Sequence, residues 1–351
     1  MRGKIKIFAG HDGGSGCAYY RIYVPLRELV RRGGHQVTFA DAGDDGHPAP
    51  VTLDMLRGHD LIVAQRWNKH SGLSVWRGAA LGSKLVYELD DDVFHITAEN
   101  WNAYRLYNRP DIRDAVMHAA ETADLVTVST EPLAQVMREY SGNVAVCPNA
   151  IPDWVLTLPR LPETLGRARP RVGWQGGASH GIDIGQVASP VRRFLRRFPG
   201  WDLQLNGADY RVTFRVPPDR AVHVPWVPVY DQPERYYAGL DFDIGLAPIW
   251  PTIFSASKSG LKVIEYGARG IPSIASDCPA YSGIITHGVD GFLVKHDHEW
   301  LRYLSELASD DGLRARMGEA ARAMAARHVI STGYLAWEAA YESLFRARTG
   351  V

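Results

Sequence analysis

Cysteine is scarce in this sequence, and long apolar runs are missing. The 351 residues include three cysteines, far apart in the chain: Cys17, Cys147 and Cys278. This odd, dispersed set gives neither a disulfide framework nor a zinc-ligand spacing, so we expect a reducing, cytoplasmic setting. No apolar run approaches the ~20 residues of a membrane-spanning helix, and the N-terminus lacks the apolar core of a signal peptide. We therefore expect neither a transmembrane segment nor a small disulfide-rich secreted scaffold.

A net charge is also missing. Lys+Arg and Asp+Glu number 39 each, so no overall field attracts nucleic acid or an anionic membrane. A local basic patch does occur at the end of a predicted helix, where the helix dipole alone favours it; it comprises Arg192, Arg193, Arg196 and Arg197. The apolar content of 46% and charged content of 22% are ordinary for a globular enzyme and exclude a largely disordered chain.

Short apolar segments alternate with helical stretches along the whole chain. We expect strands at 5–9, 35–40, 60–64, 84–89, 124–129, 143–146, 171–174, 202–205, 221–224, 242–246, 272–275 and 292–294. Such alternation predicts parallel sheets that are covered by helices on both faces. A length of 351 residues predicts about two domains.

A stretch with five prolines, 148–170, interrupts this rhythm and is typical of a linker. We expect an α/β protein with two Rossmann-like domains whose parallel sheets face a central cleft. The predicted domains are 1–153, joined by a final helix at about 331–351, and 154–330. Because ligands of such sheets bind beyond the carboxyl ends of the strands, the cleft between the domains is the expected site.

A glycine-rich turn, Gly10–Gly16, follows the first predicted strand and opens a predicted helix at about 18–32, as a phosphate-binding turn does. Tyr19 stands where a dinucleotide fingerprint has its third glycine. Asp41 at the end of the next strand keeps an NAD-dependent oxidoreductase open as an alternative. A tight turn without a ligand is the third possibility.

A second glycine-rich turn lies at 173–183. Gly176 and Gly177 allow backbone N–H groups to approach an anion, and the following helix start adds partial positive charge. His180 is placed to donate to a phosphate, although a histidine in a loop is more often only solvated.

The segment 247–277 carries the densest set of candidate binding residues. A helix that starts near Ser257 would bring Lys258, Lys262 and Glu265 onto one face. The buried face would then carry Leu261, Ile264 and Ala268. The alternative is a solvated helix surface with charge pairs three residues apart.

This segment resembles the nucleotide-diphosphate-binding segment of GT-B-fold glycosyltransferases, especially glycosyltransferase family 4. Shorter stretches that also resemble the family lie at 13–21, 123–130, 146–150, 224–227, 243–248 and 288–294. The resemblance implies a hexosyl- or pentosyltransferase that takes a nucleotide-diphosphate sugar as co-substrate, retains configuration and requires no cofactor or metal. It also implies a final helix that crosses back to the first domain, where the apolar stripe through Trp337 would supply the contact.

The resemblance also implies roles for individual residues. Expected donor-binding residues are Gly14, Gly176, Gly177, His180, Asn206, Lys258, Ser259, Gly260, Leu261 and Glu265. Expected acceptor-binding residues are Ser15, Tyr20, Arg21, Asp90 and Asp92, and expected catalytic residues are Lys258, Asp91 and His95. One departure is Ser257, which replaces the first of two family glutamates eight positions apart. It leaves the donor sugar undefined and keeps a catalytically silent sugar-nucleotide-binding protein as an alternative.

The acidic cluster from Glu88 to Asp92 ends a strand of the first domain. Three carboxylates could hold Mg²⁺ or Mn²⁺, but in this fold the diphosphate belongs on the second domain. A contact to an acceptor hydroxyl or a helix cap is therefore favoured over a metal site. Candidate acceptors are a glycan, a lipid-linked sugar, a small molecule or a hydroxylated DNA base; the last is disfavoured because the chain has no net positive charge.

Overall fold

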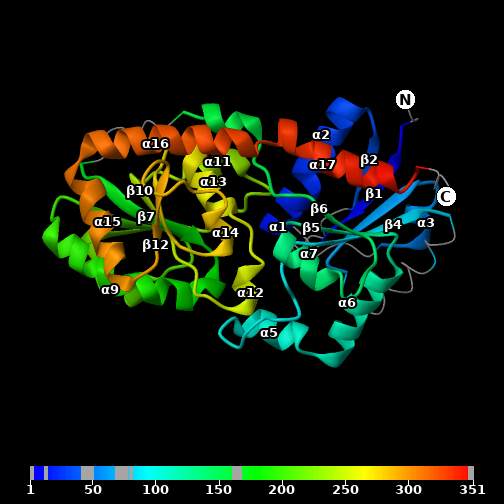
Figure 1. Ribbon diagram of the computed structural model, residues 1–351, viewed down its shortest axis with the longest axis horizontal. Coiled ribbons are helices and arrows are strands. Elements are labelled where there is room, and N and C mark those ends of the chain that lie inside the picture. The colour runs from blue at the N-terminus through cyan, green and yellow to red at the C-terminus, as the bar shows by residue number, and fades with distance from the viewer. Residues whose placement is uncertain are drawn as a thin grey trace.

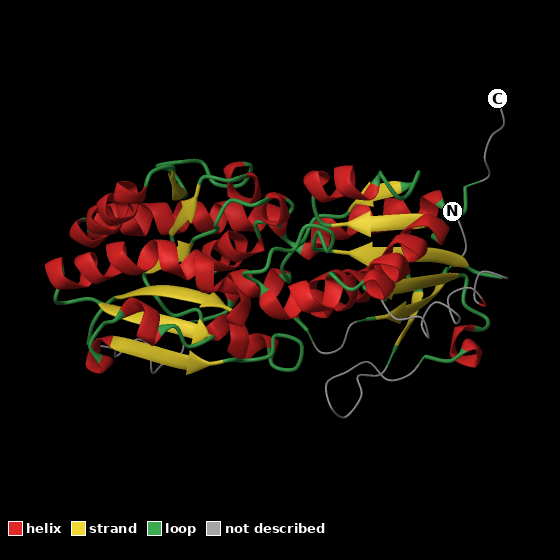
Figure 2. Cartoon of the chain, turned by 90° about the horizontal axis from the view of Figure 1, so that it is seen from below, coloured by secondary structure: helices red, strands yellow, loops and turns green. Residues whose placement is uncertain are grey.

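The computed structural model describes residues 4–11, 15–40, 51–67, 78, 82–159 and 168–346. They form two separate sheets of six parallel strands each (Figure 2). The first sheet has the order β2-β1-β3-β4-β5-β6. Its strands are β1 (Lys6–Gly10), β2 (Gln36–Phe39), β3 (Leu61–Gln65), β4 (Lys84–Leu89), β5 (Leu125–Val128) and β6 (Val144–Val146).

The second sheet has the order β12-β11-β10-β7-β8-β9. Its strands are β7 (Arg171–Gly176), β8 (Asp202–Gly207), β9 (Ala221–Pro225), β10 (Ile244–Ala247), β11 (Ser273–Ser276) and β12 (Gly291–Val294). Each of the twelve predicted strands overlaps one of these. The prediction of two Rossmann-like domains with parallel sheets is therefore confirmed.

Helices cover both faces of each sheet. Around the first sheet lie α1 (Gly16–Ala18), the π-helical turn η1 (Tyr19–Tyr23), α2 (Val24–Gly33), α3 (Leu53–Leu56), α5 (Trp101–Tyr107), α6 (Pro110–Thr122) and α7 (Glu131–Met137). Around the second lie η3 (Ala178–His180), α9 (Gly181–Arg197), α10 (Arg211–Phe214), η4 (Pro218–Arg220), α11 (Pro233–Ala238), α12 (Ile253–Ala256), α13 (Leu261–Ala268), α14 (Pro279–Ser282), α15 (Asp297–Ser309) and α16 (Asp311–Ala325). Short turns η2 (Asp153–Thr157) and η5 (Ala326–His328) lie where the chain passes between the domains, and α17 (Ile330–Ser343) ends the described chain.

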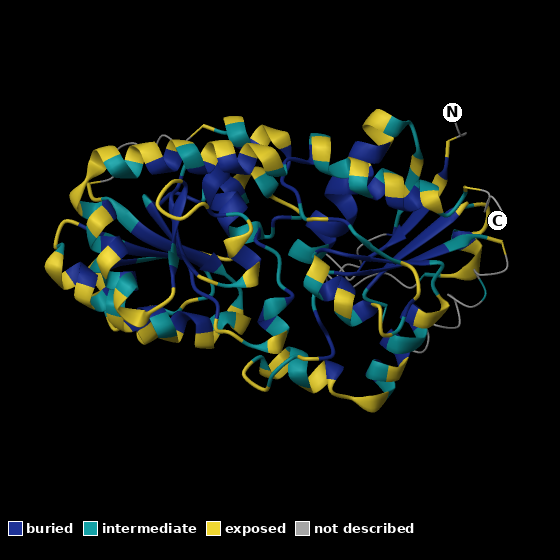
Figure 3. Cartoon of the chain, in the orientation of Figure 1, coloured by how far each residue is buried: buried dark blue, intermediate teal, exposed yellow. Residues whose placement is uncertain are grey.

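The strands form the buried layer of each domain (Figure 3). Every residue of β3, for example, is buried. A strand between two helical layers must be apolar on both sides, which is why the strands are recognisable as short continuous apolar runs. In the part of the chain that the structure describes, no helix is both long enough and apolar enough to cross a membrane.

The final helix returns to the first domain. Figure 1 shows α17 beside α2, and the two helices pack against each other. Trp337 is 1% exposed and packs in the same apolar cluster as Ile22 and Leu26. The guanidinium carbon of Arg21 lies 4.5 Å from the centre of the Trp337 ring. The prediction that this helix crosses back and packs through Trp337 is confirmed.

The carboxyl ends of the two sheets point toward each other, as the strand arrows of Figure 2 show. The loops that follow the strands of both domains therefore meet at the centre of the molecule. This is where α/β sheets bind ligands.

Candidate active site

The loop between α12 and α13 joins the two domains at the centre. The Thr130 hydroxyl, at the start of α7, donates to the Ser257 carbonyl at 2.7 Å. The Asn149 side-chain amide, after β6, donates to the Ser259 hydroxyl at 2.8 Å. The segment that sequence analysis assigned to donor binding thus lies directly against the carboxyl edge of the first sheet.

The predicted single helix from Ser257 is wrong, because two helices replace it. A capping box of Thr252 and Ser255 starts α12, which ends at Ala256, and α13 begins only at Leu261. Gly260 stands directly before α13, and a side chain there would meet Ile284 and the Ala280 carbonyl at 2.1 and 2.5 Å, so the position requires glycine.

Lys258 consequently lies in the loop and does not share a helix face with Lys262 and Glu265. Its ammonium is 3.5 Å from a carboxylate oxygen of Asp91, across the domain boundary. Burial raises the pKa of Asp91, but the charges of Lys258 and Arg66 outweigh it and lower the pKa to about 2. Asp91 is therefore a carboxylate at neutral pH and holds the ammonium in the cleft.

Glu265 and Lys262 lie one turn apart on α13. Glu265 is 5% exposed and accepts hydrogen bonds from the Tyr20 hydroxyl and from the Tyr236 hydroxyl, the latter at 3.1 Å. Burial raises its pKa to about 7. Lys262 donates to the Gln175 carbonyl, and burial lowers its pKa to about 8. Because both pKa values lie near neutral pH, a charged or hydroxyl-bearing ligand can shift the protonation of either group.

The second glycine-rich turn, between β7 and α9, lies beside this pair. His180 is not merely solvated, because its Nδ1 lies 2.7 Å from Asp183 and its side chain is 21% exposed. The other oxygen of Asp183 accepts from the Trp250 amide at 2.7 Å. Burial lowers the pKa of His180. A second carboxylate thus fixes a second basic group close to the start of a 17-residue helix.

Two pockets extend from these residues. One contains Asn206, Trp226 and Tyr236 among its lining residues. The other, of about 110 Å³, includes Lys258 and His180 of the second domain together with Thr97, Glu99 and Asn100 of the first. The Asn206 amide donates to the Gly239 carbonyl at 2.7 Å, which fixes the β8 end beside α11.

Comparisons with known proteins agree with this geometry. Residues 253–324 match the sequence model of the family described as Glycosyl transferases group 1. Two solved structures that are similar over 97% of this chain are HepE from Anabaena in complex with UDP and glucose (TM-score 0.70, 15% identity, 100% of that chain) and sucrose-phosphate synthase from Thermosynechococcus elongatus (TM-score 0.64, 16% identity, 99% of that chain). The fold is GT-B.

A third similar structure is the pneumococcal O-GlcNAc transferase GtfA in complex with UDP and GlcNAc (TM-score 0.60, 16% identity). The match covers 84% of this chain and 59% of that chain. No curated protein matches this sequence. The resemblance to glycosyltransferase family 4 therefore rests on the 253–324 segment and on the shared GT-B fold.

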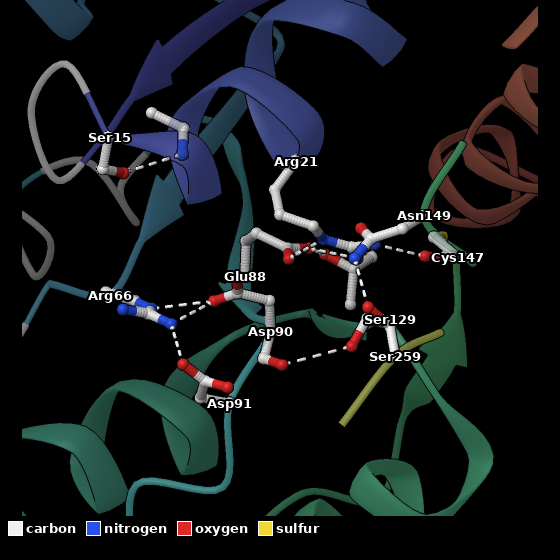
Figure 4. Close-up of polar contacts among 12 residues, drawn as sticks. Ser15, Arg21, Arg66, Glu88, Asp90, Asp91, Ser129, Cys147, Asn149 and Ser259 are labelled. Atoms are coloured by element: carbon white, nitrogen blue, oxygen red, sulfur yellow. Dashed lines mark hydrogen bonds and ion pairs between the residues drawn. The ribbon is translucent and has the colours of Figure 1, made fainter. Parts of the chain in front are cut away.

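At the first-domain side of this GT-B cleft, Arg66 organises the acidic cluster (Figure 4). Its guanidinium donates to Asp90 at 2.8 Å and to Asp91 at 2.7 Å. Arg66 has φ of +52°, a left-handed backbone conformation that is unusual for any residue but glycine. Sequence analysis missed Arg66, although its position directly after the buried strand β3 is a signal.

The structure also brings Cys17 near Asp90 and Asp91, with potential metal-ligating atoms within 4.8 Å of one another. Among the described residues this is the one such group. The guanidinium of Arg66 already binds both carboxylates, so a divalent cation would have to displace it or bind beside a positive charge.

Two expected acceptor residues are buried away from the cleft surface. Arg21 is 0% exposed and its Nε donates to Glu88 at 2.6 Å, with further bonds to Asn149 and to the Cys147 carbonyl (Figure 4). Asp92 is 1% exposed and accepts from the Phe94 amide at 3.2 Å. In this structure both side chains are held by internal contacts, and their role toward an acceptor stays a prediction.

The remaining expected residues occupy mixed positions. His95 is exposed, and its Nδ1 lies 2.8 Å from Asp92, so the structure brings it to that buried carboxylate rather than to Lys258. The Ser15 hydroxyl accepts from the Ala18 amide at 3.0 Å and caps α1. The predictions for Gly14 and Asp41 lie outside the described residues.

Tyr20 and Tyr236 complete the site, because they are the residues that meet Glu265. The π-helical turn η1 presents successive side chains in different directions: Tyr20 to Glu265 of the second domain, and Arg21 to Glu88 of the first. Tyr20 was expected to bind the acceptor, and the structure places it against the proposed donor glutamate instead. Nothing in the sequence around Tyr236 indicated a functional role.

Proposed function

We propose that this protein is a glycosyltransferase that moves a hexose or pentose from a nucleoside diphosphate sugar to an acceptor hydroxyl, with retention of configuration. The observation that carries the proposal is the gathering of Lys258, His180 and Glu265 at the carboxyl edge of the second sheet, facing the first domain. The GT-B fold and the match over 253–324 support the same activity. Uridine is the favoured nucleoside, because HepE and GtfA were solved with UDP.

The donor would lie along the edge of the second sheet. Its base would lie beside Trp226 and Asn206, whose pocket of about 10 Å³ must widen to admit it, and its ribose hydroxyls would donate to Glu265. Its diphosphate would lie over Gly176 and Gly177, at the start of α9, where unpaired backbone N–H groups and the helix dipole favour an anion. Ser259, Gly260 and Leu261 would form the adjoining loop and helix start.

The ribose would replace the tyrosine hydroxyls that now bind Glu265. The hydroxyl of Tyr20 and the two ribose hydroxyls are the same kind of hydrogen-bond donor. The carboxylate would therefore exchange one hydroxyl donor for another. The exchange explains why a buried carboxylate is kept without an ion-pair partner among the described residues: the charge of Lys262 acts on it from one turn away, and its hydrogen bonds come from tyrosine hydroxyls.

Lys258 would stabilise the leaving group. In the transfer, the bond between the anomeric carbon and the diphosphate oxygen breaks, and the electron pair stays on the diphosphate. The acceptor oxygen bonds to the anomeric carbon and gives up its proton, which the leaving phosphate oxygen can take. The ammonium of Lys258 would offset the charge that develops, while Asp91 positions Lys258.

The acceptor side would be formed by Asp90, Ser15 and the pocket wall of Thr97, Glu99 and Asn100. No pair of nucleophile and base is needed in this scheme, because positioning and electrostatics supply the catalysis. We propose that no cofactor or metal is required, since cationic side chains already neutralise the diphosphate. A glycan, a lipid-linked sugar and a small molecule all remain candidate acceptors.

Calorimetric titration with UDP, GDP and ADP tests the proposal. We expect UDP to bind, and a saturating nucleotide at 100 times its Kd to stabilise the fold by roughly 2.7 kcal/mol in thermal unfolding. The matched variants are Lys258→Ala and Lys295→Ala, since Lys295 is a surface lysine paired with Asp277. Binding of none of the three nucleotides at millimolar concentration would overturn the proposal. Slow hydrolysis of a UDP-sugar without acceptor would separate an enzyme from a silent binding protein.

A further inference from the structure

A third pocket lies where the chain passes between the domains, away from the donor site. Its volume is about 460 Å³. Its walls are one face of η1 and α2, the start of η2 and the start of α17, contributed by Tyr19, Tyr23, Arg27, Arg31, Trp154 and Ile330. Small-molecule sites typically measure ~300–1,000 Å³ and occur preferentially at domain interfaces. No step of the proposed transfer uses this pocket.

The walls are mainly aromatic and apolar. Tyr19, Tyr23, Val24 and Ile330 are buried, and Trp154 is 37% exposed. The underside of the Trp154 ring is fixed, because it packs edge-to-face on Tyr237 at 5.5 Å. A flat ring would thus find a rigid apolar surface in this pocket.

The free polar groups of the pocket are hydrogen-bond donors. Of its two carboxylates, Glu28 already accepts from Arg31 at 2.6 Å and from Arg32. Asp153 accepts from the Ser331 amide at 3.1 Å and from the Ser331 hydroxyl. The pocket's acids are therefore occupied.

Arg27 is different. It is exposed, and in the described part of the chain no carboxylate lies within 4 Å of its guanidinium, which lies 5.5 Å from the centre of the Tyr23 ring. Its charge acts on the Tyr19 hydroxyl, for which the described residues offer no hydrogen-bond partner. A positive charge and a free hydroxyl on one apolar pocket favour an anion that carries a ring.

Contacts between aromatic side chains connect the pocket to Glu265. Tyr19 packs edge-to-face on Tyr20 at 5.0 Å, and the Tyr20 hydroxyl donates to Glu265. On the opposite wall, Trp154 packs on Tyr237, whose hydroxyl lies 2.6 Å from that of Tyr20. Both walls thus reach Tyr20, one of the two tyrosines whose hydroxyls the donor ribose would have to displace from Glu265.

We propose that this pocket binds a small anion built on a flat ring, such as an aryl or cyclic phosphate or carboxylate, and that its occupancy changes donor affinity through Tyr20. The ring lies on Trp154 and between the tyrosines, and the anionic group meets Arg27 and the Tyr19 hydroxyl. The proposal that the pocket binds such an anion depends on the pocket alone. The proposal that binding changes donor affinity rests on the proposed function and its donor site.

The test uses 1-naphthyl phosphate as the probe in calorimetric titration of the full chain. We expect Arg27→Gln to weaken its binding about tenfold or more, as loss of a charge-assisted hydrogen bond does. Arg27→Lys should retain most of the affinity, and Trp154→Ala should weaken binding similarly. The uncharged 1-naphthol should bind far more weakly than the phosphate.

The control is a matched pair on α5, where Arg105 lies 5.9 Å from the ring centre of Trp101, an exposed tryptophan outside the pocket. Arg105→Gln and Trp101→Ala should leave probe binding unchanged. Absent binding, or equal loss in both pairs, would overturn the site. A second titration with UDP, with and without saturating probe, tests the coupling; an unchanged UDP affinity would overturn that half. If UDP fails to bind at all, the proposed function fails, and the first titration still decides the site.

Discussion

Two buried glutamates at the centre of the molecule differ in the groups that compensate their negative charge. Glu88 ends β4 of the first sheet, and Glu265 lies on α13 of the second domain. Burial raises the pKa of each to about 7. Arg21 donates to both oxygens of Glu88, at 2.6 and 3.2 Å, and the Thr127 hydroxyl adds a third bond. Among the described residues, the hydrogen bonds to Glu265 come from tyrosine hydroxyls alone, and the charge of Lys262 acts on it without an ion pair.

The difference separates a structural carboxylate from a functional one. Glu88 is saturated, and its partner Arg21 also packs against Trp337, so the pair holds α17 on the first domain. Glu265 has partners that a ligand hydroxyl can replace. A buried carboxylate without a cation costs stability, and such local costs are typical of binding sites.

The largest expected effect comes from removing the partner of Glu88. Arg21→Met should destabilise the protein by about 3–5 kcal/mol, because it leaves a buried carboxylate uncompensated. Urea denaturation measures this loss. The control is Arg31→Met, which removes an exposed arginine from Glu28 while Arg32 still pairs with that carboxylate, and should cost at most about 1 kcal/mol. Equal losses in the two variants would show that Arg21 holds Glu88 no more strongly than the exposed Arg31 holds Glu28.

The next largest effect is expected at Lys258, the cation on the second-domain side of the cleft. Lys258→Ala should slow turnover of a UDP-sugar by about 10²–10³-fold, because one electrostatic contact to the leaving group is lost. UDP binding should weaken less than turnover slows, since the contact strengthens as charge develops. Steady-state kinetics of UDP release measure the first quantity and calorimetry the second. The comparison variant is Lys295→Ala, and a slowing there of similar size would contradict the assignment.

Glu265→Gln sharpens the contrast between the two glutamates. UDP should bind about tenfold more weakly, since a neutral amide accepts ribose hydroxyls less strongly. The same variant should raise Tm at pH 8 by about 1–2 °C, because it removes a buried charge without an ion-pair partner, worth about 1 kcal/mol. Differential scanning fluorimetry and calorimetry give both numbers. Weaker binding together with a lower Tm would indicate a structural glutamate.

The pH dependence follows from the raised pKa of Glu265. Since the group is protonated below about pH 7 in the fold and below about 4.5 when unfolded, its contribution to stability is present at pH 4 and lost as pH rises through 7. The Tm advantage of Glu265→Gln should therefore shrink as pH falls below 7 and vanish near pH 4. UDP affinity of the unsubstituted protein should increase several-fold from pH 6 to pH 8 relative to the variant. Parallel curves for the two proteins would contradict the assignment.

The smallest expected effect concerns metal removal. Because Arg66 occupies Asp90 and Asp91 and Lys258 contacts Asp91, EDTA should change turnover less than about twofold, a free-energy change well under 1 kcal/mol. Assays with and without added Mn²⁺ check this. Activity that is lost in EDTA, restored by Mn²⁺ and absent in Asp90→Asn would make the acidic cluster a metal site.

The sequence predicted the fold better than the site. Buried strands such as β3 are short apolar runs, and the stripe through Trp337 fixed the face of α17, so local pattern was sufficient. The break between α12 and α13 was missed, because helical periodicity does not mark where a short helix ends. The pairing of Arg21 with Glu88 was missed because the two residues lie 67 positions apart. Arg66 and Tyr236 acquire roles only when strand ends and helices from distant segments meet.

The most direct test of the account is a crystal structure with UDP bound. We predict the ribose hydroxyls within hydrogen-bond distance of Glu265, the Tyr20 hydroxyl displaced from that carboxylate, and the diphosphate between Lys258 and the Gly176–Gly177 turn. A nucleotide bound instead at the edge of the first sheet, with Tyr20 still donating to Glu265, would contradict the assignment of the donor site to the second domain.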